Sequence, residues 1–110
     1  MKLPNADNAV IDLKKLRDYC LNPVHPRGKH KARVFQSRLG ITKDDAEILK
    51  EKILEGVIKR NCLAGESDIY GIRYIVDIQV NVIGRSAPVR TTWIVKNKED
   101  FPRLTSCYVL

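Results

Sequence analysis

The pattern of apolar and polar positions divides the chain of 110 residues into two halves. Residues 1–60 show the spacing of amphipathic helices, whereas residues 62–110 show the alternation of strands. No repeat, low-complexity tract or linker separates the two halves. Helices followed by a run of strands predict an α+β fold, with three N-terminal helices packed on one face of a C-terminal antiparallel sheet of about four strands. We expect residues 1–110 to form a single domain.

The first predicted helix begins at Asp12, a residue type that caps helix N-termini well. Leu13, Leu16 and Cys20 then recur on one face and form an apolar stripe. The helix should end before Pro23, because proline disfavours a helical residue ahead of it.

Two further helices follow the proline loop. The second should span about residues 29–39, with Gly40 in the left-handed position after its end. Thr42 and Asp45 form the capping-box opening of the third. The expected buried faces of these two helices are Ala32, Phe35 and Leu39, and then Ala46, Leu49, Ile53 and Val57.

The second half reads as a series of antiparallel strands. Apolar and polar residues alternate over residues 72–82, and Tyr70-Gly71 marks a turn from a weaker strand before them. Gly84-Arg85-Ser86 is a hairpin signal, so the next strand should return over about residues 87–96. KNKEDFP should form a loop, and RLTSCYVL a last strand. One face of the 87–96 strand should hold Val89, Thr91, Trp93 and Val95, and the other Pro88, Arg90, Thr92, Ile94 and Lys96.

The composition is that of a globular protein, with 44% hydrophobic and 30% charged residues. No apolar run is long enough to cross a membrane, and the N-terminus has no signal-peptide pattern. Cys20, Cys62 and Cys107 cannot all pair and have no metal-ligand spacing. We therefore expect a reduced, cytoplasmic protein whose cysteines are small buried hydrophobes.

The positive charge is concentrated in one segment. Twenty Lys and Arg residues against 13 Asp and Glu residues give a net charge of +7. No acidic residue lies between Tyr19 and Thr42, and His25 and His30 are interleaved with the basic residues of this stretch. Such a segment attracts RNA, another polyanion or an acidic protein, although a solvated helix face explains it too. The cations of this segment are Arg27, Lys29, Lys31, Arg33 and Arg38.

One set of residues could cleave RNA without a metal. His30 lies near the start of the second helix, and Arg90 and Thr92 share the polar face of their strand. Ser106 and Tyr108 share one face of the last strand, and Thr105 and Cys107 should take the other. A base, one or two cations and a hydroxyl suffice, because RNA supplies its own 2′-hydroxyl as the nucleophile. Each residue also has an ordinary structural role available.

Other chemistry is poorly supported. No glycine-rich loop has phosphate-binding spacing, and His25 and His30 have no further metal ligand near them. We expect neither a cofactor nor a metal. Asp77 should form an ion pair with Arg73 or Arg90 across the strands.

Nearly the whole chain resembles a small bacterial family of unknown function. The resemblance is carried by LPNADNAVI, LNPVHPRGKHKARVF, YGIRYIVD, VRTTWIV and PRLTSCYVL. Members of that family occur alone, commonly in cyanobacteria, and as C-terminal modules of secreted polymorphic toxins. Toxin modules of this size are similar in fold to the barnase, EndoU, colicin and RelE group of metal-independent ribonucleases.

That similarity implies a set of site residues. A basic or histidine residue on an early helix would act with Arg and with Ser, Thr or Tyr on the sheet. The matching catalytic positions are His30, Arg90, Thr92, Ser106 and Tyr108, with Lys31 and Arg33 as phosphate contacts. Arg27 and Lys29 of the basic segment are further candidate nucleic-acid contacts. The chain departs from the pattern in lacking a second well-placed histidine or glutamate.

Three functions remain open. The first is a toxin-type ribonuclease that acts on RNA through a basic cleft and is held in check by a small cognate inhibitor protein. The second is a non-catalytic module that binds an acidic protein or nucleic acid through the basic helix. The third is a structural or immunity-like protein without an enzymatic site. The first requires the start of the second helix to overlook the polar side of the C-terminal strands.

Overall fold

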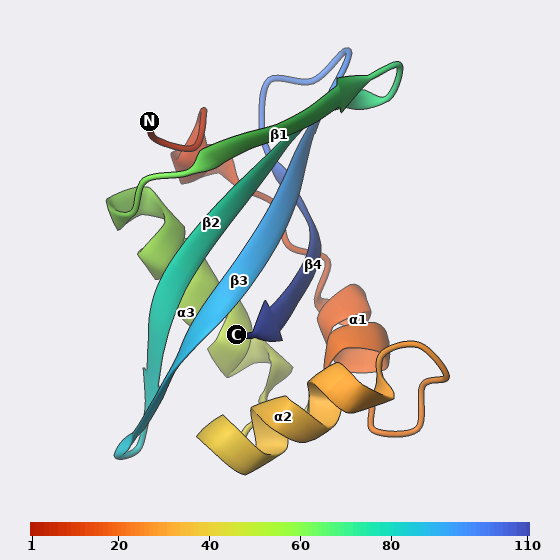
Figure 1. Cartoon of the computed structure of the whole chain (residues 1–110), viewed down its shortest axis with the longest axis vertical. Coiled ribbons are helices and arrows are strands. Elements are labelled where there is room, and N and C mark those ends of the chain that lie inside the picture. The colour runs from red at the N-terminus through yellow and green to blue at the C-terminus, as the bar shows by residue number, and fades with distance from the viewer.

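The computed structural model describes residues 1–110 and has the expected α+β architecture. Helices fill the first half, and four antiparallel strands follow in the order β1-β2-β3-β4 (Figure 1). The helical elements are η1 (Ala6–Asn8), α1 (Leu13–Lys15), η2 (Leu16–Cys20), α2 (Lys29–Leu39), η3 (Lys43–Asp45) and α3 (Ala46–Lys59). The strands are β1 (Leu63–Asp68), β2 (Gly71–Val82), β3 (Arg85–Lys96) and β4 (Arg103–Val109).

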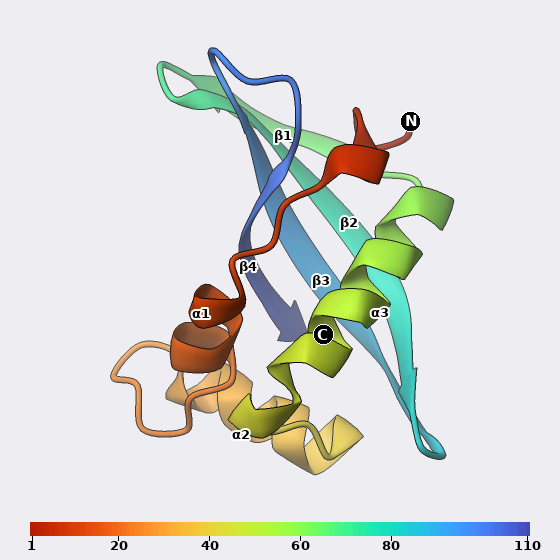
Figure 2. The ribbon, with the colours of Figure 1, turned by 180° about the vertical axis from the view of Figure 1, so that it is seen from behind.

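The helices cover one face of the sheet and leave the other open. Viewed from behind, α3 runs across that covered face, while α2 lies near the end of β4 (Figure 2). The core between the two layers is one cluster of 22 buried residues, with Trp93 and Phe35 as its largest fully buried side chains. None of the helices is both long enough and apolar enough to span a bilayer.

The expected helix signals are confirmed. The Asp12 carboxylate accepts a hydrogen bond from the Lys14 amide at 3.0 Å, which caps α1. Thr42 and Asp45 form the reciprocal capping box ahead of α3. Gly40 follows α2 with a φ of 69°, the left-handed conformation that glycine adopts without steric cost.

The turn between β2 and β3 lies earlier than the sequence predicts. Val82 pairs with Arg85, so the turn consists of Ile83 and Gly84 alone, and Ser86 already belongs to β3. Both turn residues have positive φ, 42° and 79°. This is the mark of a type I′ turn, whose twist matches that of the two strands.

A bulge in β4 corrects the expected face of Thr105. Thr92 pairs with Ser106 and Trp93 pairs with Leu104, so Thr105 is an extra residue in β4. A bulge of this kind breaks the strict alternation of side chains. The Thr105 and Thr92 hydroxyl oxygens lie 2.7 Å apart, whereas Cys107 is buried in the core as expected.

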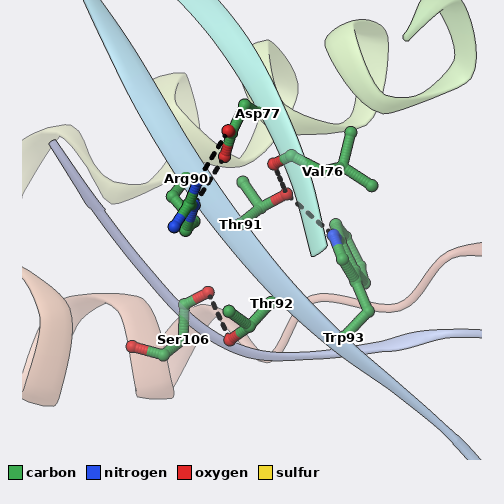
Figure 3. A network of polar contacts seen from close by, with 7 residues as sticks. All are labelled: Val76, Asp77, Arg90, Thr91, Thr92, Trp93 and Ser106. Atoms are coloured by element: carbon green, nitrogen blue, oxygen red, sulfur yellow. Dashed lines mark hydrogen bonds and ion pairs between the residues drawn. The ribbon is translucent and has the colours of Figure 1, made fainter. Parts of the chain in front are cut away.

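The covered face also contains a short polar chain. The Trp93 indole Nε1–H donates to the Thr91 hydroxyl at 2.8 Å, and that hydroxyl donates to the Val76 carbonyl at 2.7 Å (Figure 3). Because all three groups lie in the core, these bonds satisfy atoms that would be costly to leave unpaired.

The three cysteines are free and buried, as the sequence predicts. The hydrogen bond with Cys107 lowers the pKa of the Cys20 thiol to about 7, although burial opposes this shift. The same bond, together with burial, raises the pKa of Cys107. The contact fastens η2 to β4 in the core.

Candidate functional site

The proline loop fixes where α2 begins. The His25 ring nitrogen Nδ1 accepts hydrogen bonds from the backbone amides of Arg27 at 3.0 Å and Gly28 at 3.1 Å. A Cβ on Gly28 would lie 2.2 Å from the Tyr19 carbonyl oxygen, so only glycine allows this close approach to η2. His25 also packs edge-on against Tyr19, with ring centres 4.7 Å apart. His25 thus organises the loop.

This arrangement places Lys31 between two tyrosines. The Lys31 ammonium lies 5.0 Å from the centre of the Tyr108 ring and 5.8 Å from that of Tyr19. Both separations allow a cation–π attraction, which holds the flexible lysine stem in one position. The start of α2 therefore meets the end of β4 through Lys31.

Arg90 continues the site across the open face. It pairs with Tyr108 in the β3–β4 register and with Asp77 in the β2–β3 register. Its Nε and Nη2 each donate to an Asp77 carboxylate oxygen at 2.9 Å, which confirms one of the two expected ion pairs (Figure 3). Nη1 makes no bond to Asp77.

The ion pair shifts the pKa of both partners. Hydrogen bonding to Arg90 lowers the pKa of Asp77, with burial opposing it. Hydrogen bonding to Asp77 is the largest cause that raises the pKa of Arg90, and the neighbouring Tyr108 adds to this. Asp77 is therefore a carboxylate and Arg90 a cation throughout the neutral range.

Three hydroxyls lie beside this row on β3 and β4. The Thr92 hydroxyl contacts the Thr105 hydroxyl. It also lies 3.2 Å from the carbonyl oxygen of Ser106, to which it can donate (Figure 3). The Ser106 hydroxyl itself is buried and has no hydrogen-bond partner. It does not face solvent, so in this conformation Thr92 and Thr105 are the hydroxyl groups nearer to a ligand on the open face.

His30 is not part of this arrangement. Ala32 belongs to the buried stripe of α2, and His30 lies two residues before it, which rotates it by about 200° around the helix axis. His30 is exposed and forms no hydrogen bond or ion pair with Arg90 or Tyr108. The structure thus shows no contact of His30 with the sheet, and it is Lys31 that contacts Tyr108.

The other basic residues named for the site are exposed or half-buried. Arg27 and Arg33 are exposed, and Lys29 is half-buried. None of the four cavities on the protein is lined by Arg90 or Tyr108, so the expected basic cleft is instead an open surface. No cluster of three or more His, Cys, Asp or Glu residues has the geometry of a metal site.

Tyr19 is the one member of the site that the sequence did not suggest. It belongs to η2, and it reaches Lys31 only because Gly28 brings that element against the start of α2. Gly28, which follows Pro23 and Pro26, is the residue in the sequence that could have indicated this contact, since a glycine can mark a close approach of two backbone segments.

These features define a class: a small α+β protein with helices on one face of an antiparallel sheet, and a Lys–Tyr–Arg row on the other side at the helix–sheet junction. The chain belongs to the DUF6883 family, a domain of unknown function, whose model matches residues 2–110. A family of unknown function is what the sequence led us to expect.

Comparison with solved structures shows the same fold elsewhere. A chain of a contact-dependent growth inhibition toxin–immunity protein complex from Klebsiella pneumoniae 342 aligns with a TM-score of 0.71 at 16% identity. The alignment covers 92% of this chain and 99% of that one. No curated protein matches the sequence.

Proposed function

We propose that the protein is a toxin-type ribonuclease that cleaves RNA in the cytoplasm without a metal ion. The observation that supports this most directly is the row formed by Lys31, Tyr108 and Arg90, in which a phenol lies between two cations. We call these three residues the cationic row. Lys31 takes the role of the basic residue on the early helix, in place of His30.

The chemistry follows from the charges that develop on the phosphate. The RNA 2′-oxygen attacks the adjacent phosphorus and loses its proton to solvent, and the bond from phosphorus to the 5′-oxygen breaks. Lys31 and Arg90 stabilise the extra negative charge of the phosphorane. The Tyr108 hydroxyl donates a proton to the departing 5′-oxygen and regains one from water. Asp77 fixes the guanidinium of Arg90.

The fold supports the same proposal and adds a partner. The structural neighbour belongs to a complex of a toxin with its immunity protein. By analogy with that complex, we propose that a small cognate inhibitor protein binds this chain. Fold alone does not determine function, so the assignment depends on the cationic row.

Induced expression in a bacterial host tests this function. We expect the wild-type protein to arrest growth and, when purified in the presence of a chelator, to cleave total RNA. Lys31→Met, Tyr108→Phe and Arg90→Gln should each lower cleavage by about 100-fold or more, since each removes one contribution to the transition state. His30→Ala is the matched control on the outer face of α2 and should retain activity.

Two results would contradict the ribonuclease. The first is a harmless wild-type protein that leaves RNA intact. The second is full cleavage by the Lys31 and Tyr108 variants after circular dichroism has shown them to be folded.

A non-catalytic binding module is the second candidate function, and the open surface around α2 favours it. A module of this kind would bind RNA or an acidic protein without turnover, and its affinity for RNA would fall steeply with salt. Replacing Lys29, Lys31 and Arg33 by Ala should then abolish binding. RNA cleavage that Tyr108→Phe removes, without loss of RNA affinity, would contradict this second function.

A further inference from the structure

Half of β2 lacks a strand neighbour on one side. β1 pairs with β2 only as far as the Leu63–Ile75 pair, whereas β3 accompanies β2 along its whole length. In Figure 1 the lower part of β2 accordingly forms the edge of the sheet, with α3 behind it. We call residues 76–82 the free edge of β2. Unpaired backbone amides and carbonyls at a sheet edge are a template for another strand.

The free edge borders a groove. One cavity of about 260 Å³ lies between α3 and β2, and a second of about 330 Å³ lies where the chain passes from α3 to β1. Lys59 and Arg60 line both cavities, so the two are neighbours. Gly56 lines the first, and a Cβ there would lie 3.1 Å from Ile78, which shows how closely α3 approaches the sheet.

The groove is predominantly basic. Lys52, Lys59 and Arg60 project from α3 and its end, and the ammonium of Lys2 lies at the same end, donating to the Lys59 carbonyl at 2.7 Å. Glu55 and Asp77 are the acidic residues of the walls, and Asp77 is already paired with Arg90. The remaining polar walls are Asn61, Gln79 and Asn81.

The chemistry of the walls favours a peptide over a nucleic acid. Neither cavity is lined by an aromatic residue, so bases would have no ring to stack upon. A peptide strand, in contrast, could bond to the backbone of the free edge, and acidic side chains on it would meet the cations of α3. An acidic peptide strand therefore matches both the unpaired backbone of the free edge and the positive charge of α3.

We propose that the groove between α3 and the free edge of β2 binds an extended acidic segment of a partner protein, which adds a strand to the sheet beside residues 76–82. This surface is separate from Lys31 and Tyr108. It reaches the cationic row only through Asp77, so an occupied groove would crowd Arg90. An effect of the bound segment on RNA cleavage through Arg90 rests on the proposed function, whereas the binding of the segment does not.

Nuclear magnetic resonance of the full chain tests the proposal with a synthetic peptide of alternating glutamate and threonine. We expect it to shift the amide signals of residues 76–82, Lys59 and Arg60. The double variant Lys59→Glu/Arg60→Glu should weaken binding by about tenfold or more, because two favourable charges become repulsive. Lys96→Glu/Lys98→Glu makes the same change in charge outside the groove and should bind nearly as well as the wild type.

A second peptide separates strand addition from simple charge attraction. The same sequence with every backbone nitrogen methylated keeps every charge but loses its backbone hydrogen-bond donors on both edges, and it should not bind. Equal binding of both peptides, or no shift in residues 76–82, would overturn the proposal. So would a single-stranded RNA oligonucleotide that shifts these amides more strongly than the acidic peptide. RNA cleavage by the Lys59→Glu/Arg60→Glu variant should be unchanged, because neither residue belongs to the cationic row. The test of peptide binding is therefore independent of the test of the ribonuclease.

Discussion

The Lys31 ammonium of α2 lies 5.0 Å from the centre of the Tyr108 ring on β4, and this contact joins the helical layer to the last strand. Tyr108 is also the cross-strand neighbour of Arg90. The tyrosine therefore has two separable properties: a ring that binds a cation, and a hydroxyl that can donate a proton.

Two substitutions at Tyr108 separate these properties. Tyr108→Phe keeps the ring, so we expect its unfolding free energy to change little, while RNA cleavage falls by about 100-fold. Tyr108→Leu removes the ring as well, and its unfolding free energy should be about 1 kcal/mol lower than that of Tyr108→Phe. Urea unfolding and a cleavage assay on the same samples measure both. Equal activity of Phe and wild type would exclude a chemical role for the hydroxyl.

The Asp77–Arg90 pair predicts a pH dependence of stability. Hydrogen bonds from Arg90 lower the pKa of Asp77 below its ordinary value of 3.8, so between these two values the unfolded chain binds more protons than the folded one. The stabilisation is present above pH 3.8 and is lost as the pH falls through the lowered folded value. The difference in unfolding free energy between wild type and Asp77→Asn should therefore shrink on acidification, as urea unfolding at several pH values would show. A difference that does not depend on pH would contradict this linkage.

Much of the fold could be predicted because its signals are local. The Thr42–Asp45 capping box and Gly40 fix helix ends through contacts within a few residues. Alternation along β2 and β3 assigns side chains to faces through backbone geometry alone. These features depend on neighbours in the chain, so the sequence contains them directly.

The site was only partly predictable because it depends on rotation and register. Neighbouring helix positions such as His30 and Lys31 differ by a rotation of about 100°, so which of the two contacts the sheet depends on how α2 is turned against β4. The face of Thr105 depends on a bulge, which no pattern within β4 marks. Tyr19 is brought to Lys31 by packing between distant elements, and such contacts have no local signal.

Thr91 should be sensitive to the loss of its hydroxyl. It is fully buried, accepts from Trp93 and donates to the Val76 carbonyl. Thr91→Val keeps the shape but leaves the buried Trp93 indole N–H without an acceptor, which should cost about 1–3 kcal/mol in urea unfolding. Thr91→Ser retains the hydroxyl and is the control; its loss should be the smaller of the two. A larger loss for Ser than for Val would show that the methyl group matters more than the hydrogen bonds.

Ile83 offers a substitution that should stabilise the protein. Its φ is 42°, its side chain is 99% exposed, and Gly84 follows it in the two-residue turn. A β-branched residue is strained in this left-handed region and gains nothing here from burial, whereas Asn-Gly is the preferred pair of a type I′ turn. We expect Ile83→Asn to raise the unfolding free energy by about 1 kcal/mol, measured by urea unfolding. Ile83→Val keeps the branched side chain and should match the wild type. If Asn were no more stable than Val, the strain at this turn would not be limiting the stability of the hairpin.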